Sequence, residues 1–192
     1  MTKLKNIEHH TLSSAWATLE RIDYDFQFKD GTWKRLSRES YNRGNGTSIL
    51  LYNKEKQTVI LTKQFRMPAY VNNVNDGISI EVCAGALDKN ESPETCIIRE
   101  VAEEVGYKVK SVKKVMESYM SPGAVTEKMH YFIAEYLEDM KINDGGGVES
   151  EDEEIEVLEI PFKEALEMVN TFKIKDAKTI VLLQYTQINN LL

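Results

Sequence analysis

The stretch from Gly85 to Tyr107 constrains the fold most, because it contains a helix with its own start and stop signals. The side chain of Ser92 is suited to cap a free backbone N–H, and Pro93 loses no hydrogen bond at the first helical position. We expect the helix to run to Val105 and to stop at Gly106. Polar and apolar residues alternate in short runs on both sides of it, which predicts strands around one central helix.

This helix carries two neighbouring stripes of side chains at about 100° per residue. The apolar stripe contains Ile97, Ile98, Val101 and Val105, and the acidic stripe contains Glu100, Glu103 and Glu104. Three carboxylates beside a buried face repel one another, so the spacing predicts a positive partner. For a helix of ordinary sequence, a solvated acidic face is the alternative.

The first part of the chain predicts an antiparallel sheet. Residues 8–41 alternate polar and apolar side chains and turn at Asp30-Gly31. A sheet of two or three strands is marginally stable alone, so it must lean on the main domain or on a second copy of the chain. Trp16 and Trp33 then either serve that contact or pack in the core, and we favour packing.

The remaining sequence predicts one α+β domain. The expected strands are Ser48–Tyr52, Thr58–Phe65, Ile78–Cys83, Val109–Tyr119, Lys128–Leu137 and Ile155–Ile160, and two further helices are expected over Pro161–Val169 and Asp176–Asn189. We therefore predict a sandwich with a mixed sheet over residues 44–192, preceded by an antiparallel β subdomain over residues 1–43.

Composition narrows the function classes. The net charge of -7 argues against nucleic acid as a partner, and no apolar run reaches the length of a membrane span or of a signal-peptide core. We expect a cytoplasmic protein. Cys83 and Cys96 are too few for a disulfide framework, so we expect both to be reduced and buried.

Seven positions of the central stretch follow the pattern G-x5-E-x7-R-E-U-x-E-E-x-G-U, where U is an aliphatic residue. They are Gly85, Glu91, Arg99, Glu100, Glu103, Glu104 and Gly106. At roughly 7% usage per residue type, such a match arises by chance about once in 10^8 windows. The stretch resembles the Nudix box of the Nudix hydrolase family. Tyr107 departs from the pattern, which affects packing at the helix end and no ligand.

This resemblance implies a Nudix α/β/α sandwich that hydrolyses the diphosphate of a nucleoside diphosphate derivative with Mg²⁺, or with Mn²⁺. Carboxylate oxygens are suitable ligands for such hard cations. The resemblance implies that Glu100 and Glu104 are the main ligands, with Glu103 in support and the Ala84 carbonyl completing the shell. It also implies that Arg99 orients the glutamates.

Further stretches are similar to the subgroup of the family that hydrolyses GDP-mannose. These include Gln64-Phe65-Arg66, Tyr119 to Gly123 with Pro122, and Gly145 to Glu149. The resemblance implies a homodimer and a nucleotide-sugar substrate. The residues it assigns to the substrate are Trp16, Arg38, Glu39, Arg66, Gly85, Ala86, Glu127, Asp152 and Lys178, and Glu127 is also a further candidate for the metal cluster.

The acidic loop over residues 138–154 carries the predicted general base. In the family, a glutamate from this loop closes over the metals and activates water. Alignment back from Ile155 selects Glu153 as base and metal ligand, with Asp152 beside it, and Glu151 and Glu154 stay open as alternatives. The three glycines at 145–147 are expected to form a flexible hinge.

Two other functions remain open at this point. One is hydrolysis of ADP-ribose, because Pro122, sixteen residues after Gly106, is similar to a marker of the branch of the family that acts on ADP-ribose and nucleotide sugars. The other is a catalytically idle Nudix domain that senses a nucleotide, although such domains usually lose box glutamates and this chain keeps all of them.

Overall fold

The computed structural model describes residues 3–72, 75–148 and 154–192. The chain forms two compact units, one built from residues 1–45 and 118–129 and the other from residues 46–117 and 130–192. The first unit therefore includes the segment 118–129, which the predicted subdomain over residues 1–43 did not contain. The helices in the described part of the chain are too short or too polar to cross a lipid bilayer.

The first unit is an antiparallel sheet in the order β1-β2-β3. Its strands are β1 (Leu4–Ser14), β2 (Thr18–Gln27) and β3 (Trp33–Asn42). Asp30 and Gly31 make the predicted turn between β2 and β3, and Gly31 adopts a φ of 88°. Asp30 Oδ1 accepts a hydrogen bond from the backbone N–H of Thr32 at 3.0 Å, which stabilises this turn.

The predicted core packing of both tryptophans is wrong in the single chain. Trp16 is 77% exposed and Trp33 is 42% exposed. A three-stranded sheet has no second layer of its own to cover large side chains. Other large apolar side chains of β1 are exposed as well, namely Leu4, Ile7 and Leu12.

The second unit contains a seven-stranded sheet and most of the helices. Its strands are β4 (Gly46–Asn53), β5 (Thr58–Phe65), β6 (Ile78–Glu81), β7 (Cys83–Ala86), β8 (Lys113–Tyr119), β9 (Lys128–Glu135) and β10 (Glu156–Pro161). Its helices are α1 (Met67–Val71), α2 (Pro93–Glu104), α3 (Phe162–Asn170) and α4 (Ala177–Ile188), with short 3-10 turns η1 (Asn75–Gly77) and η2 (Glu138–Met140).

The sheet follows the order β10-β5-β4-β9-β8, with β6 paired to β5 and β7 paired to β4. The pairs β10–β5, β4–β5, β4–β7 and β5–β6 are antiparallel. Lys128 contacts Asn45 at the start of β9 and β4, and Tyr136 N donates to Tyr52 O at 2.9 Å at their ends, so these two strands run parallel. The predicted mixed sheet is confirmed.

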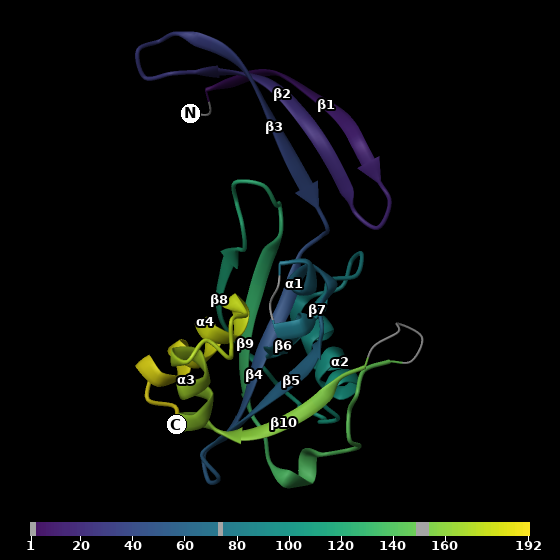
Figure 1. Ribbon diagram of the computed structural model, residues 1–192, viewed down its shortest axis with the longest axis vertical. Helices are drawn as coiled ribbons and strands as arrows, with labels where there is room; N and C mark the ends of the chain where they lie inside the picture. The colour runs from purple at the N-terminus through teal and green to yellow at the C-terminus, as the bar shows by residue number, and fades with distance from the viewer. Residues whose placement is uncertain (1–2, 73–74, 149–153) are drawn as a thin grey trace. The chain divides into compact units, whose positions relative to one another are not determined.

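Helices cover both faces of this sheet (Figure 1). The α2 residues Ile97 and Val101 pack with Ile49 and Leu51 of β4, and all four are almost fully buried. On the other face α4 contacts β4 and α3, and Leu50, Leu182 and Leu183 have no exposed surface. Because β4 is central and covered twice, all eight of its residues are buried.

The elements of the second unit differ from the sequence prediction by one or two residues at most ends, and more in three places. The predicted strand Ile78–Cys83 divides at Val82, because β6 pairs with β5 whereas β7 pairs with β4. The predicted strand Val109–Tyr119 begins only at Lys113. The short helix α1 was not predicted, and it follows Arg66 with Pro68 in its first turn.

Candidate active site

Helix α2 begins at Pro93 as its sequence predicts and ends at Glu104, one residue before the predicted end, with Val105 as its C-cap. Ser92 Oγ accepts a hydrogen bond from Thr95 N at 3.1 Å, and Pro93 is the first helical residue. Gly106 adopts a φ of 73°, and a Cβ at this position would lie 2.4 Å from the carbonyl oxygen of Asn143. Tyr107 is buried and stacks edge-on against Tyr136 at 5.2 Å, so the one departure from the box pattern fills the core below the helix.

Arg99 is the positive partner of the acidic stripe. Its Nη1 lies 2.8 Å from Glu103 Oε2 and 3.1 Å from Glu100 Oε1, and its Nη2 lies 3.4 Å from Glu91 Oε2. The hydrogen bond from Arg99 lowers the pKa of Glu91. One guanidinium thus holds three carboxylates and offsets part of their mutual repulsion.

Strand β7 passes directly against the acidic stripe. A Cβ on Gly85 would lie 2.1 Å from Glu100 Oε1, so any other residue here would displace the Glu100 carboxylate. Ala84 N donates to Glu104 Oε2 at 3.1 Å, and Glu104 is 2% exposed. Burial, together with the charges of Glu104 and Glu100, raises the pKa of the Cys83 thiol well above its usual value. Cys83 and Cys96 are free and buried, as predicted.

The donor set along α2 and β7 fits a hard divalent cation in its chemistry. The Glu104 carboxylate meets the backbone N–H of Ala84 and the Glu100 carboxylate lies against Gly85, so two carboxylates meet the backbone of β7, whose carbonyl groups are also oxygen donors. Among the described residues, however, Glu100, Glu103 and Glu104 do not form a group with ligand atoms within 4.8 Å of one another. Glu103 Oε2 accepts a hydrogen bond from Arg99 Nη1 at 2.8 Å, so a cation would compete with that guanidinium for this oxygen.

The closely spaced group that does occur in the described part lies elsewhere, on the hairpin of β1 and β2. It consists of Glu8, His10 and Asp23. Arg35 already pairs with Glu8 at 2.9 Å, and Arg21 pairs with Asp23 at 3.3 Å. These side chains form a surface ion-pair network on an exposed sheet.

Arg66 and Lys178 come together through a residue that the sequence analysis missed. Glu81, the last residue of β6, lies between them and is 4% exposed. Burial by itself raises the pKa of Glu81, but the Arg66 hydrogen bond and the charges of Lys178 and Arg66 outweigh it and lower the pKa to about 2. Its only sequence signal is a carboxylate at the end of an apolar strand, three residues before Ala84.

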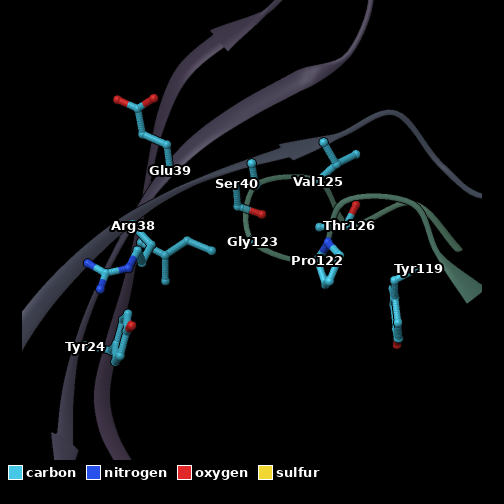
Figure 2. Close-up of a pocket in the computed structure, with 11 residues that line it drawn as sticks. Tyr24, Arg38, Glu39, Ser40, Tyr119, Pro122, Gly123, Val125 and Thr126 are labelled. Carbon is cyan, nitrogen blue, oxygen red and sulfur yellow. The ribbon is translucent and has the colours of Figure 1, made fainter.

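A cavity of about 700 Å³ lies within the first unit. Arg38 and Glu39 line it from β3, and the turn with Pro122 and Gly123 lines it from the segment 118–129. Figure 2 shows the two β3 side chains pointing to opposite sides of their strand, as the alternation of a strand requires. Tyr41 N donates to Ala124 O at 2.8 Å, which holds the turn beside β3.

The same unit brings Trp16 and Glu127 together through Arg43. The guanidinium carbon of Arg43 lies 5.3 Å from the centre of the Trp16 ring, and its Nε lies 3.6 Å from Glu127 Oε1. Glu127 is 8% exposed, whereas the Trp16 ring is largely accessible. Sequence reasoning assigned no role to Arg43 individually.

The predicted base lies outside the described residues. Asp152, Glu153 and the alternative Glu151 fall in the range 149–153, and the alternative Glu154 is described and exposed. The glycines before them, which we expected to form a flexible hinge, make hydrogen bonds to α2. Gly146 N donates to Glu104 O at 2.9 Å and Gly147 N donates to Glu103 O at 3.2 Å, so these glycines cap the C-terminal end of α2.

Comparison with known proteins finds relatives over most of the chain. The NUDIX domain model matches residues 42–183, and the model for the GDP-mannose pyrophosphatase NudK N-terminal domain matches residues 3–41. The chain is 54% identical to a GDP-mannose pyrophosphatase of Yersinia enterocolitica over 190 residues, covering 99% of this chain and 98% of the relative. It is 53% identical to a GDP-mannose pyrophosphatase of Escherichia coli O157:H7, covering 97% and 96%.

A solved structure supports the fold. The crystal structure of an ADP compounds hydrolase superposes with a TM-score of 0.70 at 19% identity, covering 98% of this chain and 95% of that one. The box spacing, the α2–β7 arrangement, the family model over most of the chain and the near full-length relatives all agree, and the chain belongs to the Nudix hydrolase family.

Proposed function

We propose that this protein hydrolyses GDP-mannose to GMP and mannose 1-phosphate with the help of a divalent cation, Mg²⁺ in the first place. The observation that carries the proposal is that both parts of the chain match family models, one for each part. The segment 3–41 matches the N-terminal domain of a GDP-mannose pyrophosphatase, and the rest carries a complete Nudix box. Both curated relatives described above bear the name of this activity.

In this proposal, Glu100, Glu104 and the Ala84 carbonyl hold the cation, and Glu103 joins them. A bound divalent cation supplies Lewis-acid chemistry: it polarises phosphoryl oxygens and promotes ionisation of water. Arg99 pairs with Glu91, Glu100 and Glu103 and offsets part of the repulsion among these carboxylates. Gly85 and Ala86 are proposed to meet the substrate from β7, where the backbone of Gly85 passes close to the Glu100 side chain.

Arg66 and Lys178 are proposed to meet the diphosphate and the sugar. Both side chains are cationic, and Arg66 is 42% exposed along its side chain while one edge is bound to Glu81. A guanidinium held on one edge is preorganised to meet an anionic oxygen with its other donors.

The first unit is proposed to recognise the guanosine and sugar moieties. Its accessible Trp16 ring is suited to stack on a base. Arg38, Glu39 and Glu127 supply hydrogen-bonding groups around the same unit. We propose that the chain acts as a homodimer, which the exposed apolar side chains on β1 and β3 support. We place the enzyme in the cytoplasm, which its two free cysteines support.

The general base remains Glu153 in this proposal, with Asp152 beside it. A carboxylate that removes a proton from the attacking water takes part in the chemical step more than in binding. Glu151 and Glu154 remain the alternatives.

Hydrolysis of ADP-ribose is the second candidate. The observation in its favour is the turn at Pro122, which lies in the cavity of the first unit beside Arg38. An idle nucleotide sensor is disfavoured because every box glutamate is present.

The test is a substrate panel in ¹⁸O-labelled water. Purified protein with Mg²⁺, with Mn²⁺ or with a chelator is given GDP-mannose, ADP-ribose and other nucleotide sugars, and products are separated by chromatography and mass spectrometry. We expect GMP and mannose 1-phosphate from GDP-mannose, no turnover with the chelator, and loss of most activity in Glu104→Gln. The labelled product identifies the phosphorus attacked. Intact GDP-mannose with turnover of ADP-ribose would replace the first candidate by the second.

A further inference from the structure

Glu81 is a buried carboxylate that neither the Nudix box nor the predicted substrate contacts include. Arg66 Nε donates to its Oε1 at 3.1 Å and Arg66 Nη2 donates to its Oε2 at 3.0 Å. Lys178 Nζ donates to Oε2 at 3.3 Å. A bidentate contact fixes the plane of a guanidinium, and a second cation on the same carboxylate fixes where the two positive groups lie relative to each other.

Each of the three residues is anchored by its own element. Arg66 follows β5, and its backbone N–H donates to Gly77 O at 2.7 Å. Glu81 ends β6, and its carbonyl accepts from Thr62 Oγ1 at 3.2 Å. The carboxylate is therefore held at a defined place on the sheet.

Lys178 is anchored from the first turn of α4. Asp176 Oδ1 accepts from Lys178 Nζ at 2.6 Å, and Asp176 Oδ2 accepts from Thr179 N at 2.9 Å. Thr179 Oγ1 in turn accepts from Val82 N at 2.8 Å. Since Val82 directly follows Glu81, the start of α4 is tied to the strand that carries the carboxylate.

Glu81 is the carboxylate that Arg66 and Lys178 share. Two cations, Arg66 and Lys178, face two carboxylates, Glu81 and Asp176, and the side chain of Lys178 is only 14% exposed. Removing the Glu81 charge leaves Lys178 paired with Asp176 and takes the bidentate partner from Arg66, so the two cations are no longer fixed relative to each other.

We propose that Glu81 is the positioning residue that fixes Arg66 and Lys178 for the phosphate and sugar oxygens of the substrate. It does not touch the reacting atoms and acts through the two cations. Holding them in advance avoids the entropy cost of ordering two long side chains when substrate binds. The inference rests on the proposed function and adds to it a positioning carboxylate outside the box.

The test compares Glu81→Gln with Glu81→Asp and with the control Glu156→Gln. Glu156 lies on β10 of the same sheet and pairs with Lys63 at 2.7 Å on the surface, so its loss tests a carboxylate–lysine pair without the buried cluster. For Glu81→Gln we expect KM to rise about tenfold or more, as for the loss of a charge-assisted hydrogen bond, with kcat within about threefold of wild type. Glu81→Asp keeps the charge and should restore part of the affinity, and Glu156→Gln should leave both constants unchanged.

A double-mutant cycle with Arg66→Ala separates positioning from a structural role. If Glu81 acts through Arg66, the second substitution raises KM much less in Glu81→Gln than in wild type. The proposal is overturned if the two substitutions raise KM by independent factors that multiply in the double variant, or if Glu81→Gln leaves KM unchanged. If Glu81→Gln does not fold, Glu81→Asp decides: a raised KM in folded protein supports positioning, and a wild-type KM rejects it. If wild type leaves GDP-mannose intact, the proposed function fails, and the same cycle is run on the panel substrate that it does hydrolyse.

Discussion

At the scale of single residues, the carboxylates of the acidic stripe of α2 are stabilised by two kinds of partner, a guanidinium and a backbone N–H. Glu100 and Glu103 share Arg99, whereas Glu104 turns inward and accepts from the backbone of β7. Arg99 lies four residues before Glu103, which is the favourable helical spacing for an ion pair. The spacing predicted this pair, but it did not predict that Glu104 is buried.

Glu81 makes stability depend on pH in the acid range. Its pKa is about 2 in the folded protein against a usual 4.5. Because the folded pKa lies below the unfolded one, the charge contributes stability that is complete above about pH 4.5 and is lost as the pH falls through about 2. The difference corresponds to about 3 kcal/mol at neutral pH. We expect the free energy of unfolding in urea to fall between about pH 5 and pH 2 in wild type, and to fall less in Glu81→Gln. Parallel pH profiles would contradict this account.

At the scale of elements, the C-terminal end of α2 is completed by a distant loop. Ile142 N donates to Gly106 O at 2.8 Å, and Gly146 and Gly147 donate to the last carbonyls of the helix. Gly145, Gly146 and Gly147 all have positive φ, which is the conformation that lets consecutive N–H groups reach these carbonyls. The loop that leads toward the predicted base is therefore anchored on the helix that carries the box glutamates.

The glycine cap predicts that alanine destabilises the protein at Gly145 and not at Gly123. Gly145 has a φ of 69°, and a Cβ there would lie 2.4 Å from Glu104 O, whereas a Cβ on Gly123 would meet nothing within 4 Å. We expect Gly145→Ala to lower the free energy of unfolding by about 2 kcal/mol or more, from left-handed strain and crowding, with Gly123→Ala close to wild type. Urea unfolding measures both. Equal stability of the two variants would mean that the cap adjusts without cost.

At the scale of the whole molecule, the two units differ in how they bury apolar surface. The second unit covers its sheet on both faces, but the first leaves Ile7, Leu12 and both tryptophans accessible. A three-stranded sheet is stable when another layer buries its apolar side chains, and in the proposed homodimer a second copy of the chain is that layer.

A dimer through β1 predicts that charge on this strand separates the subunits. We expect sedimentation velocity to show a dimer for wild type and a monomer for the double variant Ile7→Lys, Leu12→Lys, because two buried lysines at an apolar interface are costly. Ile188→Lys is the control, since Ile188 is 77% exposed at the end of α4, away from the N-terminal strands in sequence. A monomeric wild type, or a double variant that stays dimeric, would remove the N-terminal strands as the interface.

The amino-acid sequence by itself determined the local features: the limits of α2, the ion pair of Arg99, the turn at Asp30-Gly31 and the glycine at Gly106. These depend on residues within a few positions of one another, so helix and turn periodicity reveal them. Only the tertiary structure decided that Glu81 joins Arg66 and Lys178, which lie 15 and 97 residues away. It also decided that the segment 118–129 belongs with the N-terminal strands and that the glycine run caps α2. Those contacts depend on which strands pair and in which register, and strand pairing is a long-range choice that no local pattern encodes.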